Sequence, residues 1–261
     1  MRMASVGHFL FAVTMIALGV MGLVRGDFTP VWQPVAKGFP AREALVYLCA
    51  SISLASGIGL LWRRTAAPAA RLLFAWFVLW FLTIRVPDGF PTPTVLGSWY
   101  GCAETAVMVA GAWVLYAWFA TGWDGQHLGF VTGGKGLRGA RVLYGLALIF
   151  FGVAHFVYLK ETVADVPGWL PSHVAWAYFT GGAFIAGGVA VLVGVYARLA
   201  ATLGAVEIGM LTLLVWVPIV VAGTKDAFQR SETILSAALT VGAWVVADSY
   251  RGVPWLAVNK R

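Results

Sequence analysis

The chain has 261 residues, of which 60% are hydrophobic and only 11% charged, and its mean hydropathy is +0.82. These values lie far outside the range of soluble domains and exclude that class. The formal net charge of +7 does not call for a nucleic-acid partner, because anionic lipid headgroups also attract basic loops. The composition predicts an integral membrane protein whose first partner is the lipid bilayer.

Apolar stretches long enough to cross a bilayer occur eight times along the chain. A helix needs roughly 20 residues to cross a hydrocarbon core of about 30 Å. The stretches are 4–24, 44–62, 69–86, 98–120, 142–159, 174–196, 199–222 and 233–250. The first is as long as the later ones and lacks a small-residue cleavage site followed by a polar start, so we interpret it as a retained span.

Sequence motifs of the first half of the chain are repeated in the second half, in the same order. Segment 15–24 is echoed by 148–157, about 133 positions later (Gly19 to Gly152), and 109–113 is echoed by 240–244. Further matches pair Phe39-Pro-Ala-Arg with Leu170-Pro-Ser-His, Tyr47 with Tyr178, and Ser56-Gly57 with Gly187-Gly188. Such ordered matches indicate a duplicated unit.

Each copy contains four spans, an even number, so both copies enter the membrane from the same side and form a parallel repeat. We therefore expect an all-α integral membrane protein with eight transmembrane helices in two tandem, parallel-related four-helix bundles. The bundles comprise residues 1–120 and 140–261, and a glycine-rich cytoplasmic linker at 121–139 joins them.

Lysine and arginine are distributed unequally between the two faces. One face carries Arg2, Arg63, Arg64, Arg71, Lys135, Arg138, Arg141, Arg198, Arg251, Lys260 and Arg261, with Asp124 nearly the only opposing charge. On the other face, Arg25, Lys37, Arg42, Arg85, Lys160, Lys225 and Arg230 alternate with acidic residues. Uncompensated positive charge is typical of cytoplasmic loops, so we expect a multi-pass protein of the bacterial inner membrane with both termini in the cytoplasm.

The two long loops on the outer face, 25–43 and 160–173, are rich in proline and aromatic residues. The first holds Phe28, Pro30, Trp32, Pro34, Phe39 and Pro40, and the second holds Val166, Pro167, Trp169, Leu170 and Pro171. Proline fixes turns and tryptophan prefers the membrane interface. Two alternatives are open: a re-entrant or half-helical cap over each bundle, or a loop lying on the interface.

Ionisable side chains inside spans are costly and are the first candidates for function. Four such residues are Arg85, Glu104, His155 and Glu207. Arg85 and Glu104 lie near the outer ends of neighbouring spans, where a pair would either hold two helices together or line a water-filled cavity. Glu207 lies nearer the cytoplasmic end of its span and is either a proton relay or a polar contact between helices.

His155 ends the fifth span, and Tyr158 follows it; the first copy has no counterpart of either. With His173 at the start of the next span, they can frame a polar pocket beneath the loop 166–171, which contains Trp169. A histidine near its ordinary pKa can pass a proton or donate to a carbonyl. The alternative is an interfacial polar residue.

Cys49 and Cys102 lie at equal depth in two spans of the first copy. A disulfide needs a Cα separation below about 7 Å, so the alternatives are a redox-active or structural pair, or two buried small hydrophobes. The chain has no Cys-x-x-Cys, nucleotide-binding, metal-binding or nucleophile-elbow motif. We therefore expect no metal and no covalently bound cofactor, and a quinone as the candidate cofactor.

The second copy, 141–250, contains a set of motifs that point to a family. They are Gly152-Val-Ala-His155-Phe156, Val166-Pro-Gly-Trp-Leu-Pro171, Tyr178 with Gly181 and Gly187-Gly188, Arg198, and Gly242-Ala-Trp244. On these residues the copy resembles the four-helix DoxX-like (DoxX/DoxD) membrane domain, and the first copy fits the same plan in degraded form. The resemblance implies a compact four-helix bundle per copy.

Members of that wider group include the membrane subunit of a thiosulfate:quinone oxidoreductase, partner subunits of redox assemblies, and eukaryotic relatives in cargo export or receptor assembly. The resemblance therefore implies a fold more than an activity.

We expect an inner-membrane protein that binds a lipophilic partner, a quinone or a lipid, near its outer face and serves a redox or envelope-homeostasis system. His155, Tyr158 and His173 form the polar end of one pocket under this hypothesis, and Arg85 and Glu104 form its equivalent in the first copy. Its protein partner is then a membrane or periplasmic redox protein, and the chain is a candidate subunit of a quinone-linked oxidoreductase.

Two rival functions stay open. One is a non-catalytic scaffold or assembly factor for a partner complex. The other is a small-solute transporter, which the parallel repeat and the lack of clear broken-helix pairs disfavour.

Overall fold

The computed structural model describes residues 5–28, 33 and 35–258, and within these ranges it is all-helical, with 78% helix and no strand. The longer helices are α1 (Val6–Arg25), α2 (Arg42–Leu60), α3 (Ala66–Trp80), α5 (Tyr100–Phe119), α7 (Gly133–Val157), α9 (His173–Val193), α10 (Ala197–Leu211) and α12 (Ala227–Asp248). The short ones are α4 (Val86–Gly89), α6 (Gly122–His127), α8 (Leu159–Asp165), α11 (Val217–Val221), the π-helices η1 (Phe81–Arg85) and η3 (Thr212–Trp216), and the 3₁₀ helix η2 (Leu96–Trp99). The predicted all-α class is confirmed.

Seven helical segments in the described part of the chain are long and apolar enough to cross a membrane. The expected eighth span corresponds to α12, which is not among them. Helix α12 packs against α1, α5 and α10 and buries the polar side chains of Ser231 and Ser236. A helix surrounded by protein can carry polar residues that lipid would not accept, which explains its weaker hydropathy.

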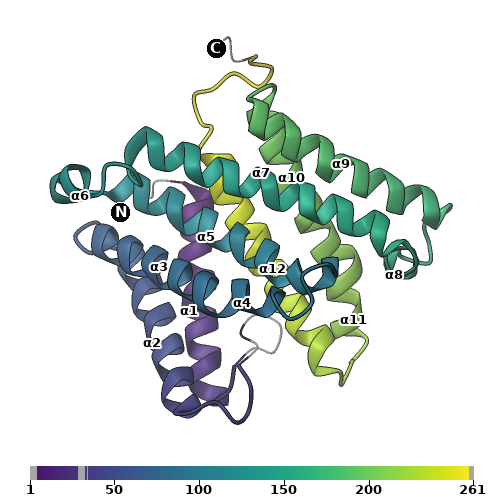
Figure 1. The fold of residues 1–261 in the computed structure, drawn as a ribbon, viewed down its shortest axis with the longest axis horizontal. Coiled ribbons are helices and arrows are strands. Elements are labelled where there is room, and N and C mark those ends of the chain that lie inside the picture. The colour runs from purple at the N-terminus through teal and green to yellow at the C-terminus, as the bar shows by residue number, and fades with distance from the viewer. Residues whose placement is uncertain (1–4, 29–32, 34, 259–261) are drawn as a thin grey trace.

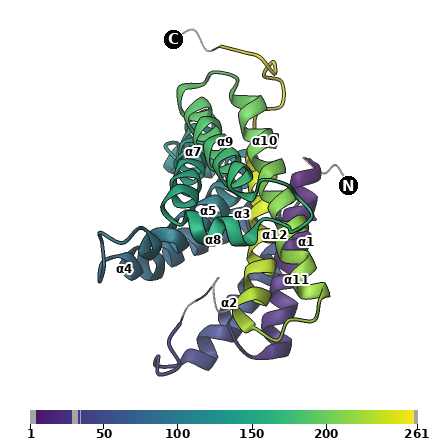
Figure 2. The same ribbon diagram turned by 90° about the vertical axis from the view of Figure 1, so that its right-hand side faces the viewer.

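The helices pack in two layers (Figures 1 and 2). In one layer the order of neighbours is α2, α1, α12, α10, and in the other it is α3, α5, α7, α9. Figure 2 shows α7 and α9 on one side of the molecule and α1 and α12 on the other. Each layer thus combines the first two helices of one copy with the last two of the other, so the two copies contact each other in both layers, through α1 and α12 in one and through α5 and α7 in the other.

Helices α5 and α12, the last of each copy, cross at the centre of the molecule. A Cβ atom on Gly111 would lie 3.0 Å from the Cα of Gly242, and one on Gly242 would lie 3.3 Å from the carbonyl oxygen of Val107. Gly111 and Gly242 are 131 positions apart and occupy equivalent places in the repeat. Small residues let the backbones of apolar helices approach closely, so this crossing joins the two layers.

Both copies contain an interrupted third helix. In the first, α3 passes through η1 into α4, which has Pro87 in its first turn; in the second, α10 passes through η3 into α11, which has Pro218 there. Proline lacks an N–H and clashes with the preceding turn, and a π-bulge is one way in which a helix accommodates such a break. The third span of each copy thus carries a π-bulge and a proline but continues as one helical segment, Ala66–Gly89 and Ala197–Val221.

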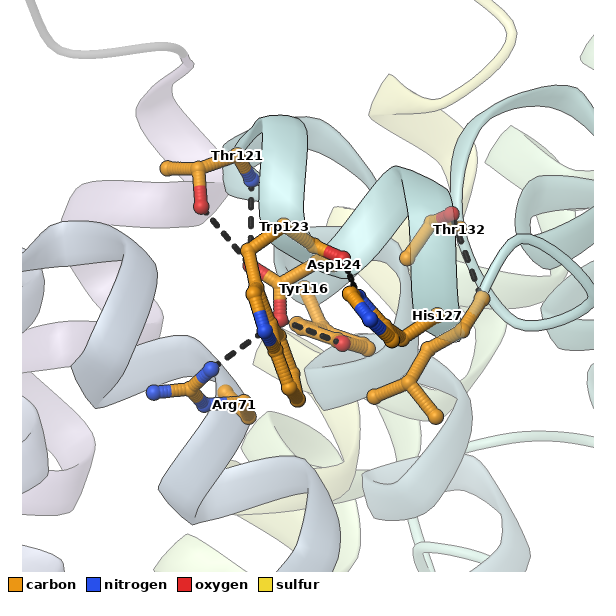
Figure 3. Close-up of polar contacts among 8 residues, drawn as sticks. Arg71, Tyr116, Thr121, Trp123, Asp124, His127 and Thr132 are labelled. Atoms are coloured by element: carbon orange, nitrogen blue, oxygen red, sulfur yellow. Dashed lines mark hydrogen bonds and ion pairs between the residues drawn. The ribbon is translucent and has the colours of Figure 1, made fainter.

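The glycine-rich segment between the copies is largely helical. Thr121 and Asp124 form a capping box that starts α6, and α7 begins at Gly133, well before the expected start of the fifth span at residue 142. Figure 3 shows the side chains of Arg71, Tyr116 and Thr121 converging on the carboxylate of Asp124. Through Asp124, this segment thus connects α6 to α3 and α5, because the carboxylate binds side chains of both helices.

In the first outer loop, Pro30, Trp32 and Pro34 lie outside the described residues. The second outer loop begins with α8 and leaves Trp169 71% exposed. It is therefore partly helical, over Leu159–Asp165.

Candidate functional site

Arg85 and Glu104 meet in a buried cluster at the end of the molecule opposite the chain termini. Arg85 is the last residue of η1, and its Nη2 lies 3.8 Å from Oε2 of Glu104 on α5. The side chains are only 7% and 5% exposed. The Nε of Arg85 donates to Oγ1 of Thr105 at 3.3 Å, and its Nη1 lies 3.6 Å from Oδ2 of Asp88 at the rim.

A third helix contributes a carboxylate that the sequence analysis did not single out. Glu232 of α12 is partly buried, and its charge attracts that of Arg85 and repels that of Glu104. It directly precedes the predicted eighth span, which begins at residue 233, and so lies outside every expected span. The available signal was Asp226, whose side chain accepts from the Phe228 N–H and starts α12 at Ala227, six residues before the expected start.

We call Arg85, Glu104, Thr105 and Glu232 the outer ion cluster. It combines one guanidinium with the carboxyl groups of Glu104 and Glu232, and Asp88 lies at its rim. The guanidinium of Arg85 can donate hydrogen bonds to a ligand. The carboxylates can accept protons, or hydrogen bonds from donor groups of a ligand. The cluster draws on both copies, because Glu232 comes from the second and the other three residues from the first.

The two cysteines are free thiols in different surroundings. Cys49 is buried in α2, where it lines a cavity of about 20 Å³ together with Asp27 and Ser53. A cavity of this size holds about one water molecule. Cys102 belongs to α5, and its Sγ donates to the carbonyl oxygen of Arg85 at 2.9 Å, so it touches the outer ion cluster.

His155 lies near the end of α7, and Tyr158 is the C-cap residue of the same helix. Its Nδ1 is 2.8 Å from the carbonyl oxygen of Phe151, and its ring packs against Phe184. The Tyr158 hydroxyl accepts instead from the Gly97 N–H at 2.7 Å, which ties the end of α7 to η2 of the first copy. Within the described ranges, no side-chain contact joins His155 to Tyr158 or to His173.

Glu207 stands apart from the outer ion cluster. Its Oε1 is buried in α10 and has no hydrogen-bond partner among the described residues. Its charge acts on Tyr144 of α7, whose hydroxyl donates to the Ala201 carbonyl at 3.3 Å. This oxygen therefore does not make the interhelical hydrogen bond that was one of the two alternatives for Glu207.

The carboxylate of Asp124, in contrast, accepts four hydrogen bonds. Oδ1 accepts from Arg71 at 3.2 Å and from Tyr116 at 2.9 Å, and Oδ2 accepts from the backbone and hydroxyl of Thr121 at 3.1 and 3.0 Å (Figure 3). A carboxylate has about four lone-pair sites. Asp124 therefore has no acceptor capacity left for a ligand, and its role is structural.

Comparison with family models, curated proteins and solved structures found no match for this chain. The resemblance to DoxX-like domains therefore depends on the sequence motifs alone. In the described part of the chain no group of three or more His, Cys, Asp or Glu residues is arranged to hold a metal ion. The function has to be argued from the outer ion cluster.

Proposed function

We propose that this protein is a DoxX-like protein of the bacterial inner membrane that binds a lipophilic molecule with a hydrogen-bonding headgroup at the outer ion cluster. A quinone is the first candidate and a lipid the second. One observation carries the proposal: the Arg85 guanidinium and the Glu104 carboxylate are buried together, with the partly buried Glu232 of the other copy nearby, in a chain that is 60% hydrophobic. The site thus lies at Arg85 and Glu104 and not at His155.

The energetic argument is that this cluster adds little to stability. Replacing a buried ion pair by well-packed apolar side chains is often neutral or stabilising, whereas breaking it by removing one partner is costly. Ionisable residues inside membrane helices usually serve a substrate or proton pathway. A binding role therefore accounts for Arg85 and Glu104 better than a packing role does.

The chemistry of the cluster suits a quinone. Quinone carbonyl oxygens accept hydrogen bonds, which the Arg85 guanidinium supplies. Oxidation of a quinol to a quinone releases two protons and two electrons; Glu104 and Glu232 are placed to accept the protons, and the electrons pass to a membrane or periplasmic redox partner protein. For a lipid, the same donors bind ester or phosphate oxygens.

In this proposal α12 is the eighth span, residues 121–139 link the copies on the cytoplasmic side, and both termini are cytoplasmic. Support comes from the basic residues near the chain termini, such as Arg141 and Arg198. Both hold the chain end, through hydrogen bonds to Ser249 and Val253. The outer ion cluster then lies near the periplasmic face.

The test uses the full-length protein purified in mild detergent. Bound quinone and lipid are extracted and quantified, and a short-chain quinone is titrated while tryptophan fluorescence is followed. We expect Glu104→Gln and Arg85→Leu to weaken quinone binding at least about tenfold, which corresponds to 1.4 kcal/mol. The matched control is Glu207→Gln, a second buried carboxylate, which leaves binding unchanged. A protein that holds neither quinone nor lipid and binds neither supports the scaffold alternative instead.

A second candidate is a small-solute transporter, and the paired π-bulges favour it. Interrupted spans at corresponding positions of two repeats mark substrate sites in many transporters, and η1 carries Arg85 directly. Uptake of solute into proteoliposomes, abolished by Arg85→Leu, supports this function. Absence of flux for all solute classes tested removes it.

A further inference from the structure

The two π-bulges receive hydrogen bonds at equivalent positions from the neighbouring helix. In the first copy, Sγ of Cys102 donates to the carbonyl oxygen of Arg85 at 2.9 Å. In the second, Oγ1 of Thr233 lies 3.3 Å from the carbonyl oxygen of Trp216 and 2.9 Å from that of Gln229, so its single proton is shared between the two acceptors. The residues of the two contacts are each separated by 131 positions (102 to 233 and 85 to 216), so the contact recurs in the second copy in a weaker form.

Both acceptor carbonyls stand where a bulge passes into a turn that contains proline. Arg85 and Trp216 end the two bulges, two residues before Pro87 and Pro218. A bulge and a following proline disturb the regular ladder of backbone hydrogen bonds. A side-chain donor on the adjacent helix therefore adds a tertiary bond at the point where the ladder is irregular.

The two copies differ in what the bulge carries. In the first copy, the acceptor residue is Arg85, and its side chain contacts Glu104 and Thr105. In the second copy the corresponding residues are Trp216, Leu235 and Ser236, so no ion cluster forms on that bulge. The Thr233 bond is thus a matched internal control for the Cys102 bond.

We propose that Cys102 is a positioning residue of the outer ion cluster, because its hydrogen bond fixes the backbone from which Arg85 reaches Glu104. Helix α5 then holds Arg85 at both ends: Cys102 binds its carbonyl, and Thr105 binds its guanidinium. This inference depends on the proposed function for its binding readout.

The first experiment compares Cys102→Ala, Cys102→Ser and Thr233→Ala for the affinity of the short-chain quinone and for Tm. Cys102→Ala is expected to weaken binding about tenfold, and Cys102→Ser, which keeps a donor, to stay within about twofold of the original protein. Thr233→Ala is expected to lower Tm by a similar amount as Cys102→Ala but to leave affinity unchanged. Equal affinity losses in both alanine variants, or no rescue by serine, overturn the positioning role.

The second experiment needs no ligand. Tm is measured for Cys102→Ala, Glu104→Gln and the double variant, and the cycle is repeated with Thr233→Ala in place of Cys102→Ala. We expect the Tm shifts of Cys102→Ala and Glu104→Gln to be non-additive in the double variant, because the two residues act through the same cluster. The Tm shifts of Thr233→Ala and Glu104→Gln should be additive, because these residues are separate sites. Additive shifts in both cycles overturn the inference. Coupling in the first cycle, with no quinone or lipid bound, leaves the inference standing and rejects only the proposed function.

Discussion

The guanidinium of Arg85 rests on the backbone of α5 at Gly101: a Cβ atom on Gly101 would lie 2.5 Å from its Cζ. The residue equivalent to Gly101 in the second copy is Glu232 (101 plus 131), whose charge attracts that of the same guanidinium. The same repeat position is thus occupied by a glycine in the first copy, which leaves room for the guanidinium, and by a glutamate in the second copy, which supplies a negative charge to it.

Gly101→Ala is expected to displace the Arg85 guanidinium and to weaken quinone binding about tenfold, with a smaller effect on stability because the displaced atoms end a flexible side chain. Titration by tryptophan fluorescence and a thermal melt measure the two effects. The control is Gly182→Ala on α9, where a Cβ atom meets nothing within 4 Å. Unchanged affinity in Gly101→Ala contradicts the close packing described here.

Arg85→Leu alone is expected to destabilise the protein by about 3–5 kcal/mol, because it leaves the Glu104 carboxylate buried without its cation. The double variant Arg85→Leu/Glu104→Leu should recover much of this loss, since no charge of that pair stays buried. Thermal or denaturant unfolding in detergent measures the difference. A double variant less stable than Arg85→Leu shows that the pair is itself a main source of stability.

Asp124 makes stability depend on pH. Burial alone would raise the pKa of Asp124, but hydrogen bonds from Thr121 and Tyr116 and the charge of Arg71 outweigh it and hold the pKa below its usual range. With a lowered folded-state pKa, the stabilisation is complete above the unfolded value of about 3.9 and is lost as pH falls through the folded value.

The expected result for Asp124→Asn is a lower Tm at pH 7 and a flatter decline of Tm on acidification below about pH 4. Glu161→Gln, at an exposed position of α8, serves as the control and should keep the original pH profile. An unchanged acid profile in Asp124→Asn rules out this linkage.

Gly111→Ala and Gly242→Ala are each expected to lower stability by about 1–3 kcal/mol, because overpacking forces neighbouring groups to move. A Cβ atom on Gly242 would also lie 3.2 Å from Sδ of Met108. The two glycines share one contact, so their effects should be non-additive. Additive shifts in Tm would mean that the two positions relax independently.

Several features of the site could be read from local sequence. Arg85 and Glu104 stand out because each interrupts an apolar run, and the repeat places their spans side by side. Glu232 was missed because its helix begins earlier than its hydropathy indicates. Cys102 was singled out only as a partner for Cys49, because its hydrogen bond to Arg85 depends on the position of a bulge in another helix. Predictions about the membrane orientation and the bound molecule stay predictions.

The sequence by itself determined the helical class, the long apolar segments and the order of the repeated motifs, because these follow from local hydrophobicity and from residues close together in the chain. Only the tertiary structure decided how the halves meet, with α5 and α12 crossing at Gly111 and Gly242. The physical reason is that nearly every face of these helices is apolar, so hydrophobicity does not select partners. Close packing at small residues and the few buried polar contacts select them, and both depend on residues far apart in the chain.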